Sequence, residues 1–317
     1  MSDNVVRESE LNFDKADDIK RQLVFSIENT LNQLFIMHRI FGRTKSQNSL
    51  NKKLGNEDKK YIPNIKMIED IIGIRITLYF SDDIDIVHDI LKTKFKCKEE
   101  STRKDNFGSN TFEASCHNHV FEIPCEIIGS DKILDNQNIC DSTFEVQLRT
   151  ILSEGWHEVE HDFRYKNKSH WKEQPIFDRQ LNGLLATLET ADWGMLQLFN
   201  ELAFSNYKAK AWNEMVKHKF RIRFDSTNLC SEVFEFMDIN NEFSKKVYRF
   251  SRKKLLTFIY ETKLNLPLNL NNIIFIINEL DDELNNEEIR LIAEKDFKFT
   301  YYKIQEAIKT VNTSSPC

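Results

Sequence analysis

A run of β-branched, aliphatic and aromatic side chains at residues 71–80 (IIGIRITLYF) constrains the fold of this chain more than any other feature. Such a composition is typical of a strand buried within a sheet. Apolar side chains at helical spacing precede it in residues 15–41, where Gly42 marks the expected helix end, and another helix is predicted at residues 84–91. With only eight Gly and five Pro among 317 residues, collagen-like, low-complexity and turn-rich all-β folds are excluded.

Two further strands are predicted, at residues 119–128 and 143–149. In the second of these, apolar and polar side chains alternate, so that one face of the strand meets the core and the other does not. A strand with a row of polar side chains opposite its core face suits one wall of a cleft. The apolar set is Phe144, Val146 and Leu148, and the polar set is Glu145, Gln147 and Arg149.

Helices are predicted again at residues 151–166 and 177–204, followed by a helical pattern with one short strand expected at residues 220–224. This order of elements predicts an α/β (α+β) fold with a mixed β-sheet flanked by helices and a helical C-terminal extension. We predict that residues 1–205 form the sheet-containing domain and that residues 206–317 form the mainly helical extension.

The net charge of −6, from 44 basic and 50 acidic residues, hides a basic segment near the C-terminus. Between residues 208 and 263, 13 Lys and Arg side chains stand against 7 Asp and Glu. Such a segment is either a solvated helix face or a surface for a polyanion such as RNA. The basic residues that would contact RNA are Lys245, Lys246, Arg249 and the triplet Arg252-Lys253-Lys254.

No apolar run reaches the roughly 20 residues needed to cross a bilayer, and the first residues are polar and acidic, unlike a secretory signal. The six cysteines show no CxxC spacing, which argues against a zinc finger. We therefore expect a cytoplasmic protein with reduced thiols and no membrane partner.

Residues 157–161 (HEVEH) match the HExxH pattern, in which two histidines one helical turn apart bind zinc and the glutamate acts as a base. A catalytic zinc also needs a third protein ligand. His170 is available downstream, but its spacing matches no zinc peptidase pattern. A zinc hydrolase is therefore the weakest of the alternatives.

Two carboxylates and a group of cations predict a different kind of site. Asp70 directly precedes the buried strand, and Glu145 lies on the polar face of the alternating strand. Magnesium is held by one or two protein carboxylates with phosphate oxygens and waters, while Lys and Arg neutralise the phosphates. The pattern therefore indicates either a magnesium–nucleotide site or solvated charges beside a sheet edge. The other members of the site are Arg43, Lys45, Ser49, Lys52, Lys53 and Arg75.

Four motifs in this order resemble the synthetase domain of the RelA/SpoT family, the ATP-dependent alarmone synthetases. Residues 42–54 (GRTKSQNSLNKKL) are similar to its R-x-K-x-x-x-S-x-x-x-K motif, and residues 68–75 (IEDIIGIR) to D-x-x-G-x-R. Residues 144–150 (FEVQLRT) resemble E-x-Q-[IL]-R-T, and residues 156–166 (WHEVEHDFRYK) resemble W-x-x-x-E-H-x-x-x-Y-K. The last motif absorbs the HExxH match, because its glutamate and second histidine belong to the family helix.

The resemblance covers roughly residues 20–205 and implies a nucleotidyltransferase-like synthetase fold. It implies transfer of pyrophosphate from ATP to the 3′-hydroxyl of GDP or GTP, with Mg²⁺ as cofactor, in a homo-oligomer such as small family members form. Each implied role belongs to a position that matches a motif. These positions are Arg43 and Arg75 around the adenine, Lys45, Ser49 and Lys53 on the ATP phosphates, Asp70 and Glu145 as catalytic residues and metal ligands, and Gln147 and Arg149 on the acceptor side.

The family segment G-Y-x-S-x-H, whose Tyr stacks on the acceptor guanine, has no clear counterpart. Residues 104–117 (KDNFGSNTFEASCH) keep the preceding Lys-Asp but lack the Gly-Tyr pair. Phe112 is the candidate for the stacking position and His117 for the histidine. The acceptor therefore stays open between GDP or GTP, the 3′-end of tRNA as in toxic family members, and no acceptor at all in a non-catalytic nucleotide sensor.

Overall fold

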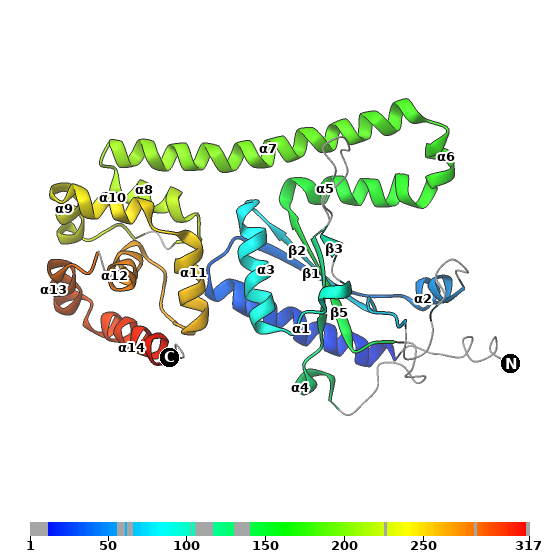
Figure 1. Cartoon of the computed structure of the whole chain (residues 1–317), viewed down its shortest axis with the longest axis horizontal. Coiled ribbons are helices and arrows are strands. Elements are labelled where there is room, and N and C mark those ends of the chain that lie inside the picture. Colours follow the sequence, from blue (N-terminus) through cyan, green and yellow to red (C-terminus); the bar gives the residue numbers. More distant parts are fainter. Residues whose placement is uncertain are drawn as a thin grey trace. The chain divides into compact units, whose positions relative to one another are not determined.

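The computed structural model describes residues 12–55, 61, 66–101, 103–104, 117–129, 140–224, 227–281 and 284–314. The chain divides into two compact units (Figure 1). The sheet unit contains the residues up to 29 and residues 38–192, and the helical unit contains residues 30–37 and those from 193 onward. Two helices, α1 (Phe13–Gln33) and α7 (Pro175–Lys208), contribute to both units. The domain boundary at residue 205 stays a prediction.

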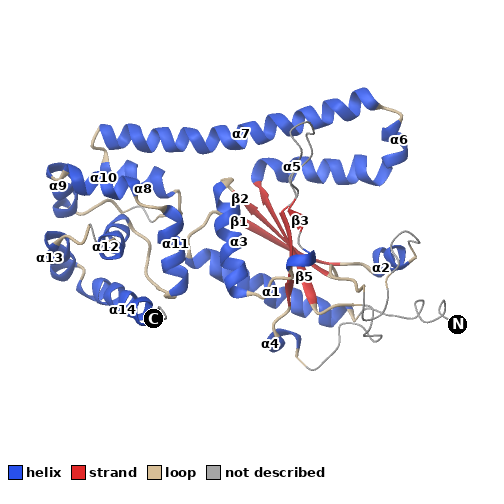
Figure 2. Cartoon of the chain, in the orientation of Figure 1, coloured by secondary structure: helices blue, strands red, loops and turns tan. Residues whose placement is uncertain are grey.

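The sheet unit is built on a five-stranded sheet in the order β1-β2-β5-β4-β3 (Figure 2). The central pair β2–β5 is parallel, and the pairs β1–β2, β4–β5 and β3–β4 are antiparallel, which confirms the predicted mixed sheet and α+β class. The central strands are almost wholly apolar on one face because helices cover that face. The strands are β1 (His38–Thr44), β2 (Ile72–Leu78), β3 (Arg103–Lys104), β4 (His117–Glu122) and β5 (Thr143–Thr150).

Two helices cover the apolar face of the sheet. The helix α3 (Asp82–Lys94) brings His88 to within 4.1 Å of His119, measured between ring centroids. The helix α1 passes so close to β1 that a Cβ on Gly42 would lie 2.7 Å from Val24 Cγ2 and 2.9 Å from Lys20 Cγ. A glycine is therefore required at position 42, where helix and strand meet. The opposite face of the sheet is left for polar side chains.

The predicted helix over residues 15–41 is wrong after residue 33, because α1 ends at Gln33 and residues 38–44 form β1. Phe35 adopts a left-handed conformation with φ 54°, which turns the chain out of the helix without a Gly or Pro. Gly42 then serves strand packing and not a helix end. The short helix α2 (Gln47–Leu54) follows, and the side chain of Ser46 caps it by accepting a hydrogen bond from the backbone N–H of Ser49 at 3.3 Å.

Beyond β5, the predicted helix over residues 151–166 has three parts. It starts as α5 (Ile151–Val159), widens into a π-helical turn (Glu160–Arg164) and tightens into a 3₁₀ turn (Tyr165–Asn167). Thr150 caps α5 in a reciprocal capping box with Ser153. The remaining short elements of the sheet unit are a 3₁₀ turn (Glu99–Ser101), α4 (Cys125–Ile128) and α6 (Lys168–Lys172).

The helical unit packs around α12 (Leu270–Leu280), whose residues 270–278 are all buried. No strand occurs at residues 220–224, a described segment where a strand was expected, since Arg221 adopts a left-handed conformation and ends α8. The side chain of Arg252 is only 6% exposed, and its Nε donates to the backbone oxygen of Phe220 at 2.5 Å. The other helices are α8 (Trp212–Phe220), α9 (Ser231–Ile239), α10 (Asn241–Arg249), α11 (Arg252–Glu261), α13 (Glu287–Asp296) and α14 (Lys298–Ser314).

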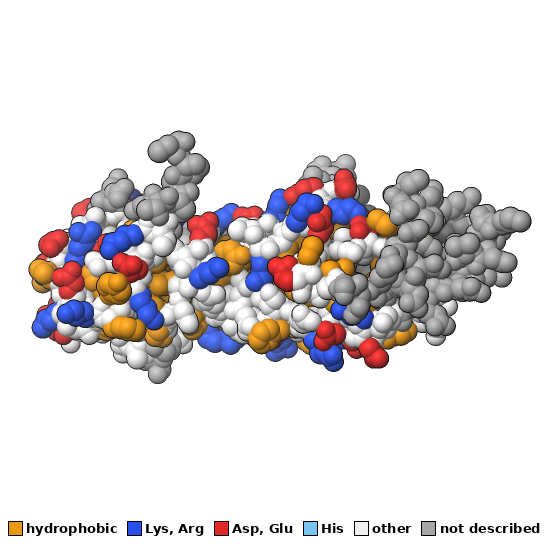
Figure 3. Space-filling view, turned by 90° about the horizontal axis from the view of Figure 1, so that it is seen from below, with side chains coloured by type: hydrophobic (Ala, Val, Ile, Leu, Met, Phe, Trp, Pro, Cys, Tyr) orange, Lys and Arg blue, Asp and Glu red, His pale blue; other side chains and the backbone are white. Residues whose placement is uncertain are grey.

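Across the described part of the chain, none of the helices combines the length and the apolar character that a membrane span requires. On the face drawn in Figure 3, basic and acidic side chains are interspersed with scattered hydrophobic ones.

Candidate functional site

Asp70 is held between two lysines at the start of β2. The backbone N–H of Lys45 donates to Ile71 at 2.8 Å, which extends the β1–β2 pairing and brings the Lys45 side chain beside Asp70. Lys45 Nζ lies 2.8 Å from one carboxylate oxygen of Asp70, and Lys53 Nζ lies 2.7 Å from the other. Burial alone would raise the pKa of Asp70, but the hydrogen bonds and charges of both lysines outweigh it and lower that pKa.

Glu145 projects from β5 into a cavity of about 590 Å³, which we call the carboxylate cavity because Glu145 and Asp70 both line it. Both oxygens of Glu145 accept a hydrogen bond from an amide. Gln147 Nε2 donates to one at 2.9 Å, and Asn118 Nδ2 donates to the other at 3.4 Å. Lys53 also lines this cavity, as do Lys66, Lys98, Glu69 and Glu100, so three cations and four carboxylates face the same space.

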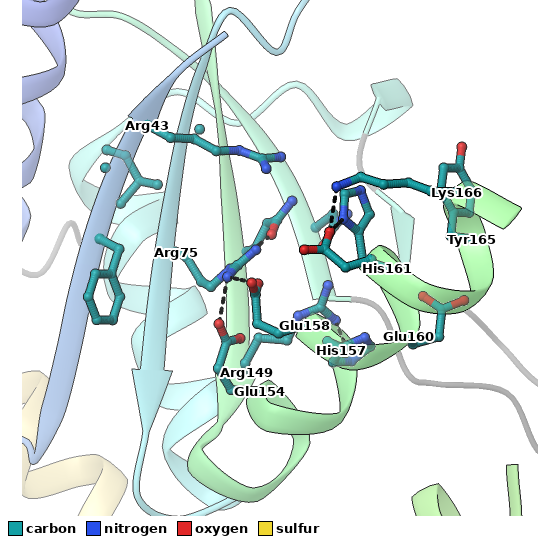
Figure 4. A pocket seen from close by; sticks show the side chains of 17 residues that line it. Arg43, Arg75, Arg149, Glu154, His157, Glu158, Glu160, His161, Tyr165 and Lys166 are labelled. Carbon is teal, nitrogen blue, oxygen red and sulfur yellow. Dashed lines mark hydrogen bonds and ion pairs between the residues drawn. The ribbon is translucent and has the colours of Figure 1, made fainter. Parts of the chain in front are cut away.

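A larger cavity of about 850 Å³ lies beside it, and we call it the arginine cavity because Arg43, Arg75 and Arg149 line it. Figure 4 shows the side chains of Arg43 and Arg75 extending from neighbouring strands toward α5 and the turn after it. Gly73 on β2 makes room for Arg43, because a Cβ there would lie 3.3 Å from Arg43 Nε.

The guanidinium group of Arg75 is held by two carboxylates of α5. Arg75 Nη1 donates to Glu154 at 2.6 Å and also to Glu158, and its Nε donates to Gln147 Oε1 at 3.4 Å. Gln147 therefore connects Arg75 to Glu145, since its amide accepts from the first and donates to the second. A chain of hydrogen bonds thus links the walls of the two cavities.

His157 is the polar partner of Arg149. Its Nε2 lies 3.0 Å from Arg149 Nη1, and burial together with the charges of Arg149 and Arg75 lowers its pKa to about 3. The imidazole is therefore neutral at physiological pH and accepts a hydrogen bond from the guanidinium. His161 instead stacks on Tyr165 at 5.7 Å between ring centroids. Within the described ranges, no group of three or more His, Cys, Asp or Glu side chains is arranged to hold a metal ion, so the HExxH match lacks the ligand set of a zinc site.

The predicted residues divide between the two cavities. Asp70, Glu145 and Lys53 line the carboxylate cavity, whereas Arg43, Arg75, Gln147 and Arg149 line the arginine cavity. Lys45 contacts the carboxylate cavity through its ion pair with Asp70. Ser49 is exposed on α2, one helical turn before Lys53. Phe112 lies outside the described residues.

The structure does not bring His117 to this site. His117 pairs with Leu148, and Asn118 pairs with Gln147. Because neighbouring residues of a strand point to opposite faces, His117 lies on the face that carries Leu148, and Asn118 lies on the face that carries Gln147 and Glu145.

Sequence reasoning missed Asn118 and Glu154, and it assigned His157 to a zinc pattern. Asn118 could not be found from the sequence, because the pairing register decides which residues of a short strand lie on which face of the sheet. Glu154 and His157 carried a usable signal, since they follow a predicted strand at helical spacing and so reach back over its polar face.

Comparison with known proteins identifies the sheet unit. Residues 42–170 match the region found in RelA/SpoT proteins, and this stretch is a RelA/SpoT-family synthetase domain, which confirms the resemblance of the four motifs. The domain contains every strand of the described sheet except the first four residues of β1.

Similar solved structures include small alarmone synthetases 1 and 2 from Bacillus subtilis and a GTP pyrophosphokinase family protein from Streptococcus pneumoniae, each 20% identical to this chain. The matches cover 59%, 59% and 57% of this chain and 93%, 96% and 88% of the other, with TM-scores of 0.45, 0.46 and 0.42. Small alarmone synthetase 1 has also been solved with its product pppGpp and with AMPCPP. No curated protein matches the chain.

Proposed function

We propose that this protein transfers pyrophosphate from ATP to the 3′-hydroxyl of a guanine nucleotide, GDP or GTP. The observation that carries the proposal is the pairing of the two cavities within a RelA/SpoT-family domain. One cavity offers two carboxylates beside lysines, and the other offers guanidinium groups from adjacent strands. The first set suits phosphates with a divalent cation, and the second suits a base and further anionic groups.

The donor nucleotide fits across the β1–β2 edge. Arg43 and Arg75 lie on neighbouring strands and face one cavity, as stacking on the two sides of an adenine requires. Lys45 and Lys53 already bind a carboxylate, and in the complex they would exchange part of that contact for phosphate oxygens. The exposed hydroxyl of Ser49 adds a donor on the same side.

The donor set fits Mg²⁺. Asp70 and Glu145 supply hard carboxylate oxygens to one cavity, and the lysines beside them bind the phosphates that complete a magnesium shell. When bound, the cation supplies neutralisation of charge that develops on the phosphates. Glu145, oriented by two amide donors, takes the proton of the attacking hydroxyl.

The acceptor side is the less defined half of the proposal. Gln147 and Arg149 line the arginine cavity, and the segment that would stack on the acceptor base lies outside the described residues. The 3′-end of tRNA is the second candidate acceptor because Lys245, Lys246 and Arg249 of α10 line a cavity of about 380 Å³, together with Glu242 and Asp281. Arg252 is buried and does not line that cavity.

Transfer is tested by supplying ATP labelled on its terminal phosphates with GDP, GTP, ATP or bulk tRNA in turn. We expect label on GDP or GTP and release of AMP. Label on tRNA, lost on charge reversal at Lys245 and Arg249, would support the tRNA alternative. ATP binding without AMP release would identify a nucleotide sensor, and absence of ATP binding would refute the proposal.

The role of Glu145 is tested by Glu145→Gln. Because the side chain faces a cavity and not the core, we expect loss of transfer by at least 100-fold with little change in the free energy of unfolding. Glu122→Gln is the matched control, since Glu122 lies on β4 in an exposed ion pair with Lys96 and should leave transfer unchanged. Unfolding of Glu145→Gln would contradict the assigned face of β5.

A further inference from the structure

Asn118 occupies the one described position that lines both cavities of the site. It lies on β4 directly opposite Gln147 of β5, so both amides stand on the polar face of the sheet. No motif and no assigned role includes this residue. Its place at the boundary between the carboxylate cavity and the arginine cavity makes it a candidate for contact with the reacting groups.

The hydrogen bonds of Asn118 fix the orientation of its amide. A carboxylate only accepts, so the amide nitrogen must face Glu145, as the distance of 3.4 Å from Nδ2 to Oε1 indicates. The amide oxygen Oδ1 must then point elsewhere. This oxygen is buried, and within the described ranges it has no hydrogen-bond partner. Buried polar atoms without a partner are uncommon, and Oδ1 therefore calls for a donor beyond those of the described residues.

A ribose offers such a donor. Its 2′- and 3′-hydroxyls are on adjacent carbons and on the same side of the ring. When the 3′-hydroxyl faces the carboxylate of Glu145, the 2′-hydroxyl lies beside the amides that touch the same carboxylate, those of Asn118 and Gln147. Gln147 already accepts a hydrogen bond from Arg75 on its oxygen, whereas Asn118 Oδ1 has no partner among the described residues. The hydroxyl would donate to Oδ1 and satisfy it.

We propose that Asn118 positions Glu145 through its amide nitrogen and selects a ribose acceptor by accepting a hydrogen bond from the 2′-hydroxyl on Oδ1. The proposal rests on the proposed transfer to a 3′-hydroxyl. It assigns two separable tasks to the two ends of one amide. A site built to bond a hydroxyl discriminates against the analogue that lacks it, because the buried acceptor is then left unpaired.

Selectivity is measured by calorimetric binding of GDP and 2′-deoxy-GDP, and by transfer from labelled ATP to each. For the unchanged protein we expect a preference for GDP of about 10- to 100-fold. Asn118→Leu, which is close in size and has no polar end, should bring the two nucleotides within about threefold of each other. An equal preference in the Leu variant and the unchanged protein would overturn the role of Oδ1.

Asn118→Asp separates the two tasks. Aspartate keeps an acceptor for the 2′-hydroxyl but replaces the donor to Glu145 by a second negative charge. We expect this variant to retain the preference for GDP and to lose at least tenfold in transfer rate, with kcat falling more than KM rises. A rate close to that of the unchanged protein would overturn the positioning of Glu145.

The outcomes distinguish this inference from the function on which it rests. If neither nucleotide binds or accepts label, the proposed function and the inference both fail. If both are bound and pyrophosphorylated equally by the unchanged protein, the function stands and the inference fails. Glu122→Gln on the same face of β4 serves again as the folding control, with its melting temperature compared with those of the Asn118 variants.

Discussion

The pair of half-buried His157 and buried Arg149 makes a prediction about acid sensitivity that does not depend on any ligand. In the folded protein His157 has a pKa of about 3, because it is buried and lies next to the Arg149 and Arg75 cations. In the unfolded chain a histidine has a pKa of about 6.5. Between these values the unfolded chain binds a proton that the folded protein does not, so stability falls as the pH falls below about 6.5.

The size of the effect follows from the two pKa values. At pH 7 the unfolded histidine is mostly neutral, and the difference between the two pKa values lowers the free energy of unfolding by about 0.2 kcal/mol. At pH 5 it is almost fully protonated, and the cost rises to about 2 kcal/mol. His157 alone should therefore remove about 2 kcal/mol of stability from the sheet unit between pH 7 and pH 5.

Urea unfolding at pH 7 and pH 5 measures this contribution when the unchanged protein is compared with His157→Gln. Glutamine still offers an oxygen to Arg149 but does not titrate, so the variant should lose about 2 kcal/mol less over the same interval. His161→Gln, at the half-exposed histidine of the following turn, separates this effect from removal of any imidazole. Equal losses in the unchanged protein and His157→Gln would refute the neutral state of His157 in the folded protein.

Three further substitutions test the architecture of the site. Gly73→Ala places a methyl group 3.3 Å from Arg43 Nε and should weaken ATP binding by roughly 3- to 10-fold with little change in stability, as measured by calorimetry. Asp70→Asn should cost about 1–3 kcal/mol at pH 7. The cost should vanish as the pH falls through the lowered folded pKa of Asp70, since its stabilisation is present above the unfolded value of about 4. Thr150→Val removes both the cap of α5 and the hydroxyl that donates to buried Asp192, and should cost about 2–3 kcal/mol in urea unfolding.

Controls for these variants lie nearby. Thr187→Val changes an exposed threonine of α7 that bonds only its own helix backbone and should shift stability by less than about 0.5 kcal/mol. A Gly73→Ala protein that binds ATP normally would show that Arg43 does not need the space above β2. Asp70→Asn with an unchanged acid profile would show that the lysine pairs do not set the charge state of Asp70.

The sequence is most informative where the signal is local. The alternation in residues 143–149 depends only on the period of a strand, and it correctly separated the core side of β5 from the side that carries Glu145 and Gln147. The apolar run that became β2 was equally clear. These two strands and the motifs on them led to the assignments of Asp70, Glu145 and Arg75, which stay predictions.

The rest depended on contacts between distant residues. The strand β1 was missed because apolar spacing continued beyond Gln33, and only pairing with β2 makes residues 38–44 a strand. His117 was named only from its place in the family motif, and one residue of register puts Asn118 instead on the face of the sheet that carries Gln147 and Glu145. Neither the strand register nor the left-handed conformation of Phe35 can be predicted from the types of the neighbouring residues.

The π-helical turn at Glu160–Arg164 has a consequence for how this chain tolerates changes in length. A π turn holds one residue more than an α-helical turn, so it resembles a single-residue insertion that the helix has absorbed. Deleting one residue there would restore a regular helix but would rotate Tyr165 and Lys166 by about 100° around its axis, away from the arginine cavity they line. In this stretch the number of residues matters as much as their identity.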